Sequence, residues 1–124
     1  MTIIELVRLL AEPLDLAVLV TDAALDRPGP TILYANPAFV RMSGYASAEV
    51  LGRSPRLLQG KATNRVLARS LTRTLRTQGR FHGVLENYRK GGEVYHCEID
   101  VRALCGGDGQ PLAFIAFERE VVRR

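Results

Sequence analysis

Three polar side chains in the sequence are suited to binding a phosphorylated ligand. Arg56 and Gln59 lie in the glycine-bounded segment Gly52–Gly60, which reads GRSPRLLQG, and Asn87 lies in a later strand-like run. A guanidinium group pairs with phosphate, and a side-chain amide both donates and accepts hydrogen bonds. These residues indicate a ligand pocket. The alternative is that Arg56 is a surface charge, Gln59 caps a turn and Asn87 satisfies backbone groups.

The histidines and cysteines do not form a recognisable catalytic or metal-binding motif. His96 and Cys97 are neighbours in an alternating run, so they are expected on opposite faces of a sheet, and His82 has no nucleophile beside it in a known pattern. No group of His, Cys and carboxylate residues has the spacing of metal ligands. Cys105 follows Cys97 by eight residues, which matches no zinc or redox motif. We therefore expect a protein that is not an enzyme, with reduced thiols in the cytoplasm.

Length and charge narrow the class of protein further. A chain of 124 residues with 47% hydrophobic and 24% charged residues is typical of one globular domain. The formal charge of +4, with few aromatic residues among the basic ones, favours a solvated basic face over a nucleic-acid site. No apolar run approaches the ~18 residues of a membrane span, and Glu5 and Arg8 make the first residues a poor signal peptide. We expect a cytoplasmic protein with no nucleic-acid or membrane partner.

The first third of the chain predicts short elements. Residues 3–11 are expected to form an amphipathic helix with a capping box from Thr2 and Glu5. Its apolar stripe (Ile3, Leu6, Val7 and Leu10) must cover either the domain's own sheet or a second copy of the chain. Residues 16–21 and 31–35 read as strands joined by a long loop. Small helices are expected to start at Asn36 and Ser47 and to end at glycines.

The remaining two-thirds predicts a longer helix and three strands. Thr63 or Asn64 is expected to cap a helix that runs to about residue 77 and ends at Gly79. Its predicted apolar stripe consists of Val66, Leu67, Leu71 and Leu75. Residues 81–89, 93–103 and 112–122 read as strands separated by glycine-rich turns, and the charged residues 118–120 are expected to decorate a sheet edge. The order of elements predicts an α+β fold, a five-stranded antiparallel sheet with small helices and one longer helix on one face.

Several segments resemble a known family. The runs ILYANPAF (32–39), MSGY (42–45) and LGR (51–53) look like the first half of a PAS domain. GRSPRLLQG, TNR (63–65) and ENYRK (86–90) resemble the LOV (light-oxygen-voltage) branch of that family. The resemblance covers about residues 14–120. It implies the PAS fold over residues 14–124, with residues 1–13 as an N-terminal helix outside it.

The resemblance implies a flavin, either FMN or FAD, between the sheet and the small helices. Arg56 matches the arginine that contacts the flavin phosphate, Gln59 the glutamine at the ribityl chain, and Asn87 an asparagine at the ring edge. Arg69 and Arg73 flank Thr72, which stands at the position of a second phosphate-binding arginine. The remaining pocket positions implied by the resemblance are Leu19, Thr21, Ile99, Cys97 and Glu118.

The departures from the LOV pattern bear on the chemistry. Pro55 stands at the position of the photoactive cysteine, and a proline has no nucleophile to form a flavin–cysteinyl adduct. Cys97 replaces a second asparagine at the ring edge. Glu118 replaces a glutamine beside the ring's reactive nitrogen, and burial would raise its pKa and favour the neutral carboxyl group. The resemblance therefore implies either a retuned flavin pocket or an empty one.

Two functions follow as expectations. The first is a sensory PAS domain that binds a flavin noncovalently and responds to light or to redox state, as the similar flavin-binding PAS domains of nitrogen-fixation regulators do. The second is a cofactor-free PAS module that works through dimerisation of the N-terminal helix and the outer sheet face. A haem sensor is disfavoured because residues 62–78 contain no histidine. We expect a homodimer, and a signal that leaves through an unidentified partner protein or through the rest of a longer polypeptide.

Overall fold

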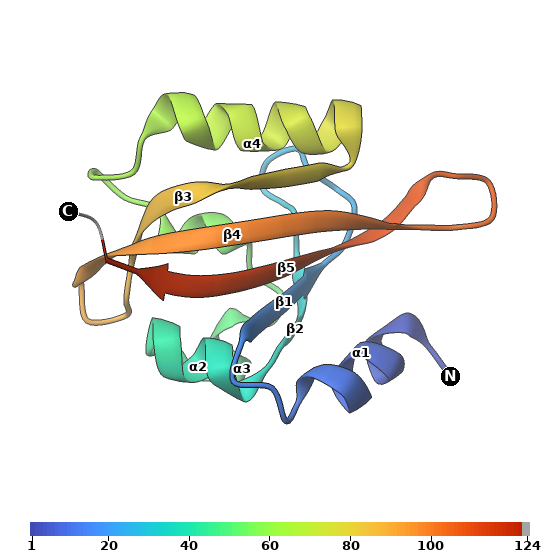
Figure 1. Cartoon of the computed structure of the whole chain (residues 1–124), viewed down its shortest axis with the longest axis horizontal. Helices are drawn as coiled ribbons and strands as arrows, with labels where there is room; N and C mark the ends of the chain where they lie inside the picture. Colours follow the sequence, from blue (N-terminus) through green and yellow to red (C-terminus); the bar gives the residue numbers. More distant parts are fainter. Residues whose placement is uncertain (123–124) are drawn as a thin grey trace.

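The computed structural model describes residues 1–122 and contains one antiparallel sheet in the strand order β2-β1-β5-β4-β3 (Figure 1). The strands are β1 (Ala17–Thr21), β2 (Ile32–Ala35), β3 (Arg80–Tyr88), β4 (Val94–Cys105) and β5 (Pro111–Val121). The helices are α1 (Ile3–Ala11), α2 (Pro37–Ser43), α3 (Ser47–Val50) and α4 (Arg65–Gln78), with a 3₁₀ helix, η1 (Pro55–Leu58). The expected five-stranded α+β fold is confirmed.

The last strand lies at the centre of the sheet. β5 pairs with β1 on one side and with β4 on the other. The expectation that residues 118–120 decorate a sheet edge is therefore wrong: Arg119 and Glu120 are exposed, but Glu118 is buried. Alternating side chains of a strand point to opposite faces, and on β5 the buried positions Phe114, Ala116 and Glu118 share the face covered by the helices.

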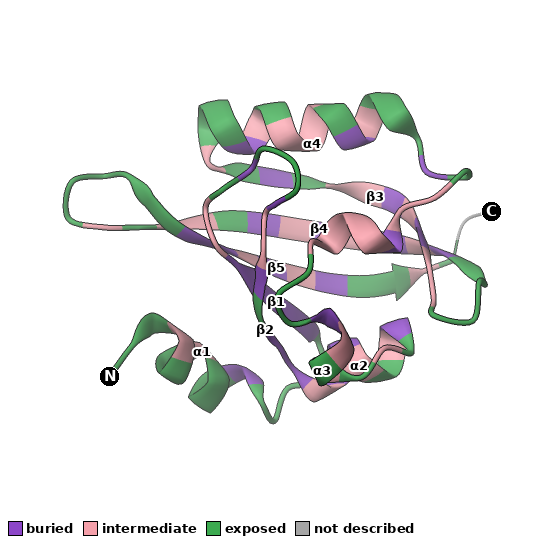
Figure 2. Ribbon diagram, turned by 180° about the vertical axis from the view of Figure 1, so that it is seen from behind, coloured by how far each residue is buried: buried purple, intermediate pink, exposed green. Residues whose placement is uncertain are grey.

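Strand β4 shows the predicted alternation. Tyr95, Cys97 and Ile99 are buried in the core between the sheet and the helices, and His96 between them is half-exposed on the other face. A sheet that is covered on one side and partly solvated on the other produces this pattern. Figure 2 shows the result as buried segments running through the strands, with exposed stretches at the turns.

Helices α2 and α4 on the core face begin and end where the residue types predict, whereas α3 is preceded by Ala46 and followed by Leu51 instead of being capped by Ser47 and ended by a glycine. Asn36 caps α2 by accepting a hydrogen bond from Phe39 N over 3.0 Å, and Asn64 caps α4 by accepting one from Leu67 N over 3.0 Å. Gly44 and Gly79 end these helices at φ values of 78° and 72°, in the left-handed region that glycine adopts without strain.

Helix α4 buries a slightly different face from the one expected. Val66 is 69% exposed, so its assignment to the apolar stripe is wrong, and Ala68 is buried instead. Leu67, Leu71 and Leu75 lie on the core side as expected. Because neighbouring residues in a helix point about 100° apart, a side that buries Leu67 and Leu71 turns Val66 toward solvent.

Helix α1 lies on the opposite face of the sheet. Ile4 and Val7 pack with Ala11 against Val18 and Val20, which alternate with the core-facing residues of β1. Helix α1 therefore covers the domain's own sheet, which is one of the two surfaces considered for it from the sequence. The buried stripe differs from the expected one, since Leu6 and Leu10 are 46% and 63% exposed.

The connection from α1 to the sheet is held by the buried side chain of Asn36. Its Nδ2 donates to Ala11 O over 3.0 Å and to Leu16 O over 2.9 Å, while its Oδ1 accepts from Val18 N over 2.8 Å. One amide therefore joins α1, the start of β1 and the cap of α2.

Within residues 1–122, no helix has both the length and the apolar character that crossing a lipid bilayer requires.

Candidate functional site

The candidate site is a pocket between the core face of the sheet and the layer formed by α4, η1 and the β1–β2 loop. Its volume is about 100 Å³, below the roughly 300–1,000 Å³ of typical ligand pockets. The walls are mostly apolar. They are formed by Leu19, Leu25, Pro30, Pro55, Leu58, Ala68, Leu71, Leu75, Leu85, Ile99, Val101, Phe114 and Ala116.

Polar groups enter this inner pocket from three of its strands. Thr21 lines it from β1, Asn87 from β3 and Glu118 from β5, and all three residues are buried. Thr21 donates to Asp22 O over 2.8 Å. A mostly apolar cavity with a few converging polar groups is the usual character of a small-molecule site.

Glu118 is the buried ionisable group of the pocket. Burial raises the pKa of its carboxyl group to about 7, and the hydrogen bond that it accepts from Cys97 partly opposes this rise. The Cys97 thiol donates to Glu118 Oε1 over 3.4 Å. Burial, together with the neighbouring Glu118 carboxyl group, raises the pKa of Cys97, so Cys97 is a neutral thiol at neutral pH.

A buried hydroxyl group lies beside this pair. Tyr95 Oη has no hydrogen-bond partner among the described residues. Asn87 lies opposite Tyr95 in the β3–β4 register. Burial raises the pKa of both the Tyr95 hydroxyl group and the Cys97 thiol, and the amide of Asn87 opposes this rise only in part. The Tyr95 ring packs under Arg89, whose guanidinium carbon lies 4.4 Å from the ring centroid. An unsatisfied hydroxyl group here is a costly arrangement.

Arg56 closes the other end of the pocket. Its Nε donates to Gly29 O over 2.9 Å and its Nη2 to Leu25 O over 3.0 Å, so η1 holds the β1–β2 loop in place. Figures 1 and 2 show that loop reaching from the sheet toward α4. Burial and the positive charge of Arg27 lower the pKa of Arg56. The Asp26 carboxylate favours the Arg56 cation, but it opposes this lowering only in part.

A second, wider hollow continues from Arg56 along α4. It has a volume of about 410 Å³ and shares Arg56, Gln59, Ala68 and Thr72 with the inner pocket. We call it the arginine groove, because six arginines line it. They are Arg27, Arg56, Arg65, Arg69, Arg73 and Arg76.

The structure brings together most of the residues proposed from the sequence. Leu19, Thr21, Arg56, Gln59, Asn87, Ile99 and Glu118 all line the inner pocket. Arg69 and Arg73 line the arginine groove instead. Cys97 does not line the pocket but lies behind Glu118, which it contacts through the hydrogen bond described above.

Sequence reasoning missed the contribution of the β1–β2 loop. Leu25 and Pro30 line the inner pocket and Arg27 lines the groove, although the sequence marked this segment only as a loop. Arg65 and Arg76 were not proposed as site residues either. The regular spacing of residues 65, 69, 73 and 76 along one helix was the available signal, but it is equally typical of a solvated helix face.

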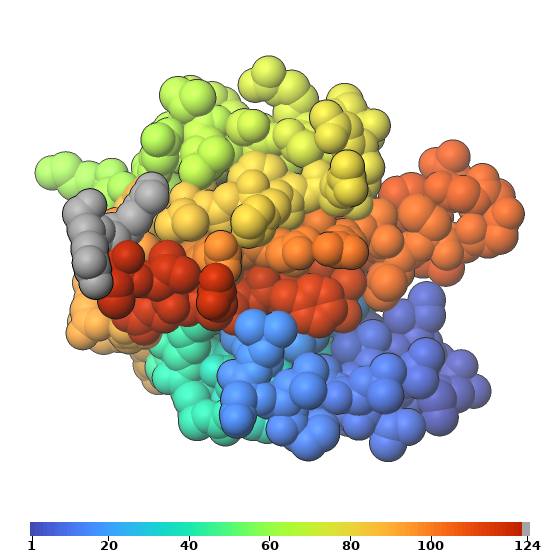
Figure 3. Space-filling view, viewed as in Figure 1, coloured from blue at the N-terminus to red at the C-terminus, as the bar shows by residue number. Residues whose placement is uncertain are grey.

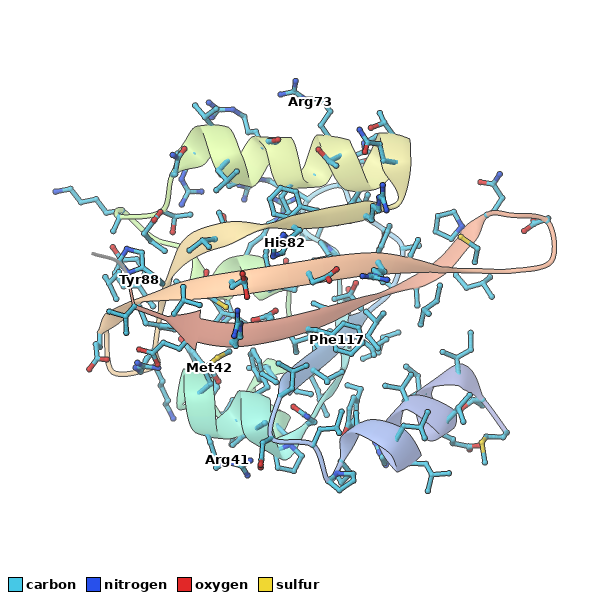
Figure 4. The ribbon with its side chains drawn as sticks, viewed as in Figure 1. Arg41, Met42, Arg73, His82, Tyr88 and Phe117 are labelled. Atoms are coloured by element: carbon cyan, nitrogen blue, oxygen red, sulfur yellow. The ribbon has the colours of Figure 1, made fainter. Side chains whose placement is uncertain are left out.

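The histidines lie outside the pocket. His82 Nε2 is 3.3 Å from Glu98 Oε2, and His96 is 4.0 Å from Glu86, both on the outer face of the sheet. His82 is labelled in Figure 4 on β3. Within residues 1–122, no group of three or more His, Cys, Asp or Glu side chains is placed to hold a metal ion.

Comparison with known proteins places the chain in a family. The family model described as "PAS domain" matches residues 17–122. A nitrogen fixation regulatory protein of Klebsiella oxytoca is 32% identical over 90% of this chain and 22% of its own length. A blue-light-activated histidine kinase of Rhizobium johnstonii is 32% identical over 89% of this chain and 31% of its own length. The chain thus spans about a fifth to a third of these relatives.

Solved structures agree with this placement. A light-oxygen-voltage domain studied with a flavin analogue superposes with a TM-score of 0.78 at 28% identity, covering 98% of this chain and 86% of that one. The chain belongs to the PAS domain family of sensory signalling domains, and light-oxygen-voltage domains are among its structural neighbours.

Proposed function

We propose that this domain is a light-oxygen-voltage-type sensor that binds a flavin noncovalently, and that it responds to light or redox state without forming a flavin–cysteinyl adduct. The observation that carries the proposal is the convergence of Arg56, Gln59, Asn87 and Glu118 on one pocket. These residues come from η1, the segment after it, β3 and β5, so only the fold brings them together. The domain acts as a binding and signalling module and not as an enzyme.

The side chains of the pocket suit a flavin chemically. Asn87 and Glu118 offer hydrogen-bonding groups at one end for a polar ring edge. Arg56 and Gln59 lie at the junction with the arginine groove, where a phosphate and a hydroxylated chain would lie. Leu19 and Ile99 offer apolar surfaces for a flat ring. Since the pocket measures about 100 Å³, a flavin would have to displace lining side chains such as Leu71.

The same residues favour a response without a covalent bond. Pro55 begins η1 and lines the pocket at the position that matches the photoactive cysteine, and its side chain offers no thiol. Cys97 lies behind Glu118 and is held as a neutral thiol, which is a poor nucleophile. A bound flavin would supply blue-light absorption and reversible reduction. Glu118, with a pKa of about 7, would exchange a proton at its carboxyl oxygens near neutral pH.

Reconstitution tests the proposal. The purified protein is mixed with excess flavin and desalted, and the visible absorption of the protein fraction is measured. The wild type should be yellow, and Asn87→Leu combined with Gln59→Leu should lower the affinity for flavin at least tenfold. His82→Gln, on the outer face, serves as the control and should bind like the wild type. A wild-type protein that stays colourless would overturn the proposal.

The relatives also bear on how the domain would pass on its signal. Its relatives are a regulatory protein and a kinase several times longer than this chain. We propose that the domain signals as a cytoplasmic homodimer, either to a partner protein or to other segments of a longer polypeptide. Size measurement by light scattering, with and without flavin, tests the dimer, and a monomer at micromolar concentration in both states would contradict it.

The second candidate is a cofactor-free PAS module that works by association. It is favoured by the small volume of the inner pocket and by the exposed apolar side of α1, where Leu9 and Leu10 are 65% and 63% exposed. Figure 3 shows this helix at the molecular surface below the sheet. Leu9→Gln combined with Leu10→Gln should abolish dimers without unfolding the domain. An unchanged mass would count against this candidate.

A further inference from the structure

Glu118 lies between the inner pocket and a separate groove on the surface of the molecule. This groove has a volume of about 500 Å³ and runs between α2, the start of β1 and the end of β5. We call it the α2–β5 groove; its lining consists of residues 15–17 and 118–120 with Ala38, Arg41, Met42 and Arg89. Figure 4 labels Arg41 and Met42 on α2. Among residues 1–122, Glu118 is the one residue that lines both the inner pocket and this groove.

The neighbours of Glu118 on the groove side are small. Ala17 lies opposite Glu118 in the register of β1 with β5, and Ala38 lines the groove from α2. Both alanines are buried in the core on the helix-covered face, and Glu118 itself is 6% exposed. Because an alanine side chain ends at Cβ, neither residue fills the space beside the Glu118 side chain.

Groups with exchangeable protons lie next to Glu118 inside the domain. The Cys97 thiol donates to Glu118 Oε1 over 3.4 Å, and Tyr95, two residues before it on β4, is buried with an unpaired hydroxyl group. Arg89, which lines the groove, lies over the Tyr95 ring with its guanidinium carbon 4.4 Å from the centroid. A protonated carboxyl group donates through one oxygen and accepts through the other, so Glu118 can take up one proton and release another.

The charges of the α2–β5 groove are balanced. Its three arginines each pair with a carboxylate: Arg41 with Asp15 over 3.8 Å, Arg89 with Glu120 over 2.7 Å, and Arg119 with Glu98. Arg89 also pairs with Glu93 over 2.8 Å. Such a surface has no strong field that would repel a proton carrier.

The opposite end of the inner pocket is less suited to proton passage. It meets the arginine groove, in which no carboxylate within residues 1–122 pairs with Arg27, Arg69 or Arg73. Uncompensated positive charge repels hydronium ions. The walls of the inner pocket are mostly apolar, and apolar side chains do not transfer protons. The end of the pocket at Glu118 is therefore the favoured one.

We propose that Glu118 is the proton-exchange residue of this domain and that it connects the inner pocket to solvent through the α2–β5 groove. A proton from solvent adds to one carboxyl oxygen, and the proton on the other oxygen passes to a group in the pocket; release runs in reverse, and Glu118 returns to its starting state. The carboxyl pKa of about 7 suits this task, because both protonation states are populated near neutral pH. The route is a property of the ligand-free protein and does not rest on flavin binding.

Hydrogen–deuterium exchange of the Cys97 thiol tests the route in flavin-free protein. The protein carries Cys105→Ser, so that Cys97 is the one remaining thiol, and its S–H stretching band is followed by infrared spectroscopy after transfer into D₂O. The thiol should exchange with Glu118, and Glu118 with solvent. Glu118→Gln should slow thiol exchange at least tenfold, because an amide does not ionise near neutral pH. The slowest backbone amides exchange through global unfolding and report any change of stability in the same sample.

Two matched substitutions distinguish the two ends of the pocket. Ala17→Val adds bulk beside Glu118 at the α2–β5 groove, and Ala68→Val adds the same bulk where the inner pocket meets the arginine groove. Ala17→Val should slow thiol exchange at least fivefold relative to the slowest amides, and Ala68→Val should leave it unchanged. If Ala17→Val does not fold, Ala38→Val adds bulk from α2 and should have the same effect.

Three results would overturn the inference. They are a thiol that exchanges only as fast as the slowest amides, an unchanged thiol rate in Glu118→Gln, and slowing by Ala68→Val in place of the groove variants. None of them bears on flavin binding, because no flavin is present in the experiment.

Discussion

The thiol of Cys97 on β4 donates a hydrogen bond to the carboxyl oxygen Oε1 of Glu118 on β5 over 3.4 Å, and both residues are buried. The arrangement places an acid at the wall of the inner pocket with a weak donor as its hydrogen-bond partner. Because desolvation disfavours the carboxylate more than a thiol stabilises it, the pKa of Glu118 rises to about 7. The pocket therefore holds a group that titrates at physiological pH.

The raised pKa of Glu118 makes stability fall as pH rises. The carboxyl group takes up its proton more readily in the folded protein than in the unfolded chain, where its pKa is near 4.5. Between these two values the folded state holds one more proton, so stability is greatest at acid pH and is lost as pH approaches and passes 7. We expect a loss of about 2–3 kcal/mol between pH 5 and pH 8 from this group.

Urea unfolding of Glu118→Gln checks this prediction. The variant should lose the Glu118 part of the pH dependence, and at pH 8 it should be more stable than the wild type because the buried charge is gone. Glu120→Gln, an exposed position on the same strand, should keep the wild-type slope. Identical slopes for the wild type and Glu118→Gln would show that Glu118 titrates normally.

Among the polar residues of the N-terminal third, Asn36 is expected to contribute most to the free energy of unfolding. Asn36→Ala removes four hydrogen bonds and leaves several buried backbone groups unpaired. It should lower the free energy of unfolding by about 3 kcal/mol or more. The matched control is Asn64→Ala at the exposed cap of α4, which should cost about 1 kcal/mol. Comparable losses of unfolding free energy in the two variants would contradict the idea that the Asn36 hydrogen bonds hold α1, β1 and α2 together.

The two buried tyrosines should respond differently to loss of their hydroxyl groups. Tyr34 Oη donates to Glu12 over 2.5 Å, whereas Tyr95 Oη has no partner in the described structure. Tyr34→Phe should therefore cost about 1 kcal/mol, and Tyr95→Phe should be neutral or stabilising. Thermal unfolding of both variants checks this. A clear loss of stability in Tyr95→Phe would mean that its hydroxyl group is satisfied in solution.

The local elements of the fold could be predicted from the sequence because their signals are local. Thr2 with Glu5, Asn36, Asn64, Gly44 and Gly79 mark helix ends by their own hydrogen bonds or backbone angles. The alternation along β4 predicted its buried face. Two details of the stripes were wrong: Val66 is exposed, and α1 buries Ile4 in place of Leu6.

The candidate site was predicted through resemblance more than through chemistry. Asn87 is far in sequence from Arg56 and Gln59. The chemistry of the three side chains suggested a ligand pocket, but only the family pattern gave each of them a place on a flavin. The pattern could not predict features specific to this chain. The pKa of Glu118 depends on burial at the sheet centre, and the arginine groove depends on the β1–β2 loop, which Arg56 and Arg76 hold against α4.

Illumination of the reconstituted protein tests whether it binds a flavin without forming a flavin–cysteinyl adduct. The protein is loaded with flavin, exposed to blue light and then denatured, and the flavin released into solution is measured against an unilluminated sample. We expect a yellow protein that releases all of its flavin in both samples, because Pro55 offers no thiol and Cys97 is buried as a neutral thiol. A protein that binds no flavin, or that retains flavin covalently after illumination, would rule out noncovalent flavin sensing by this domain.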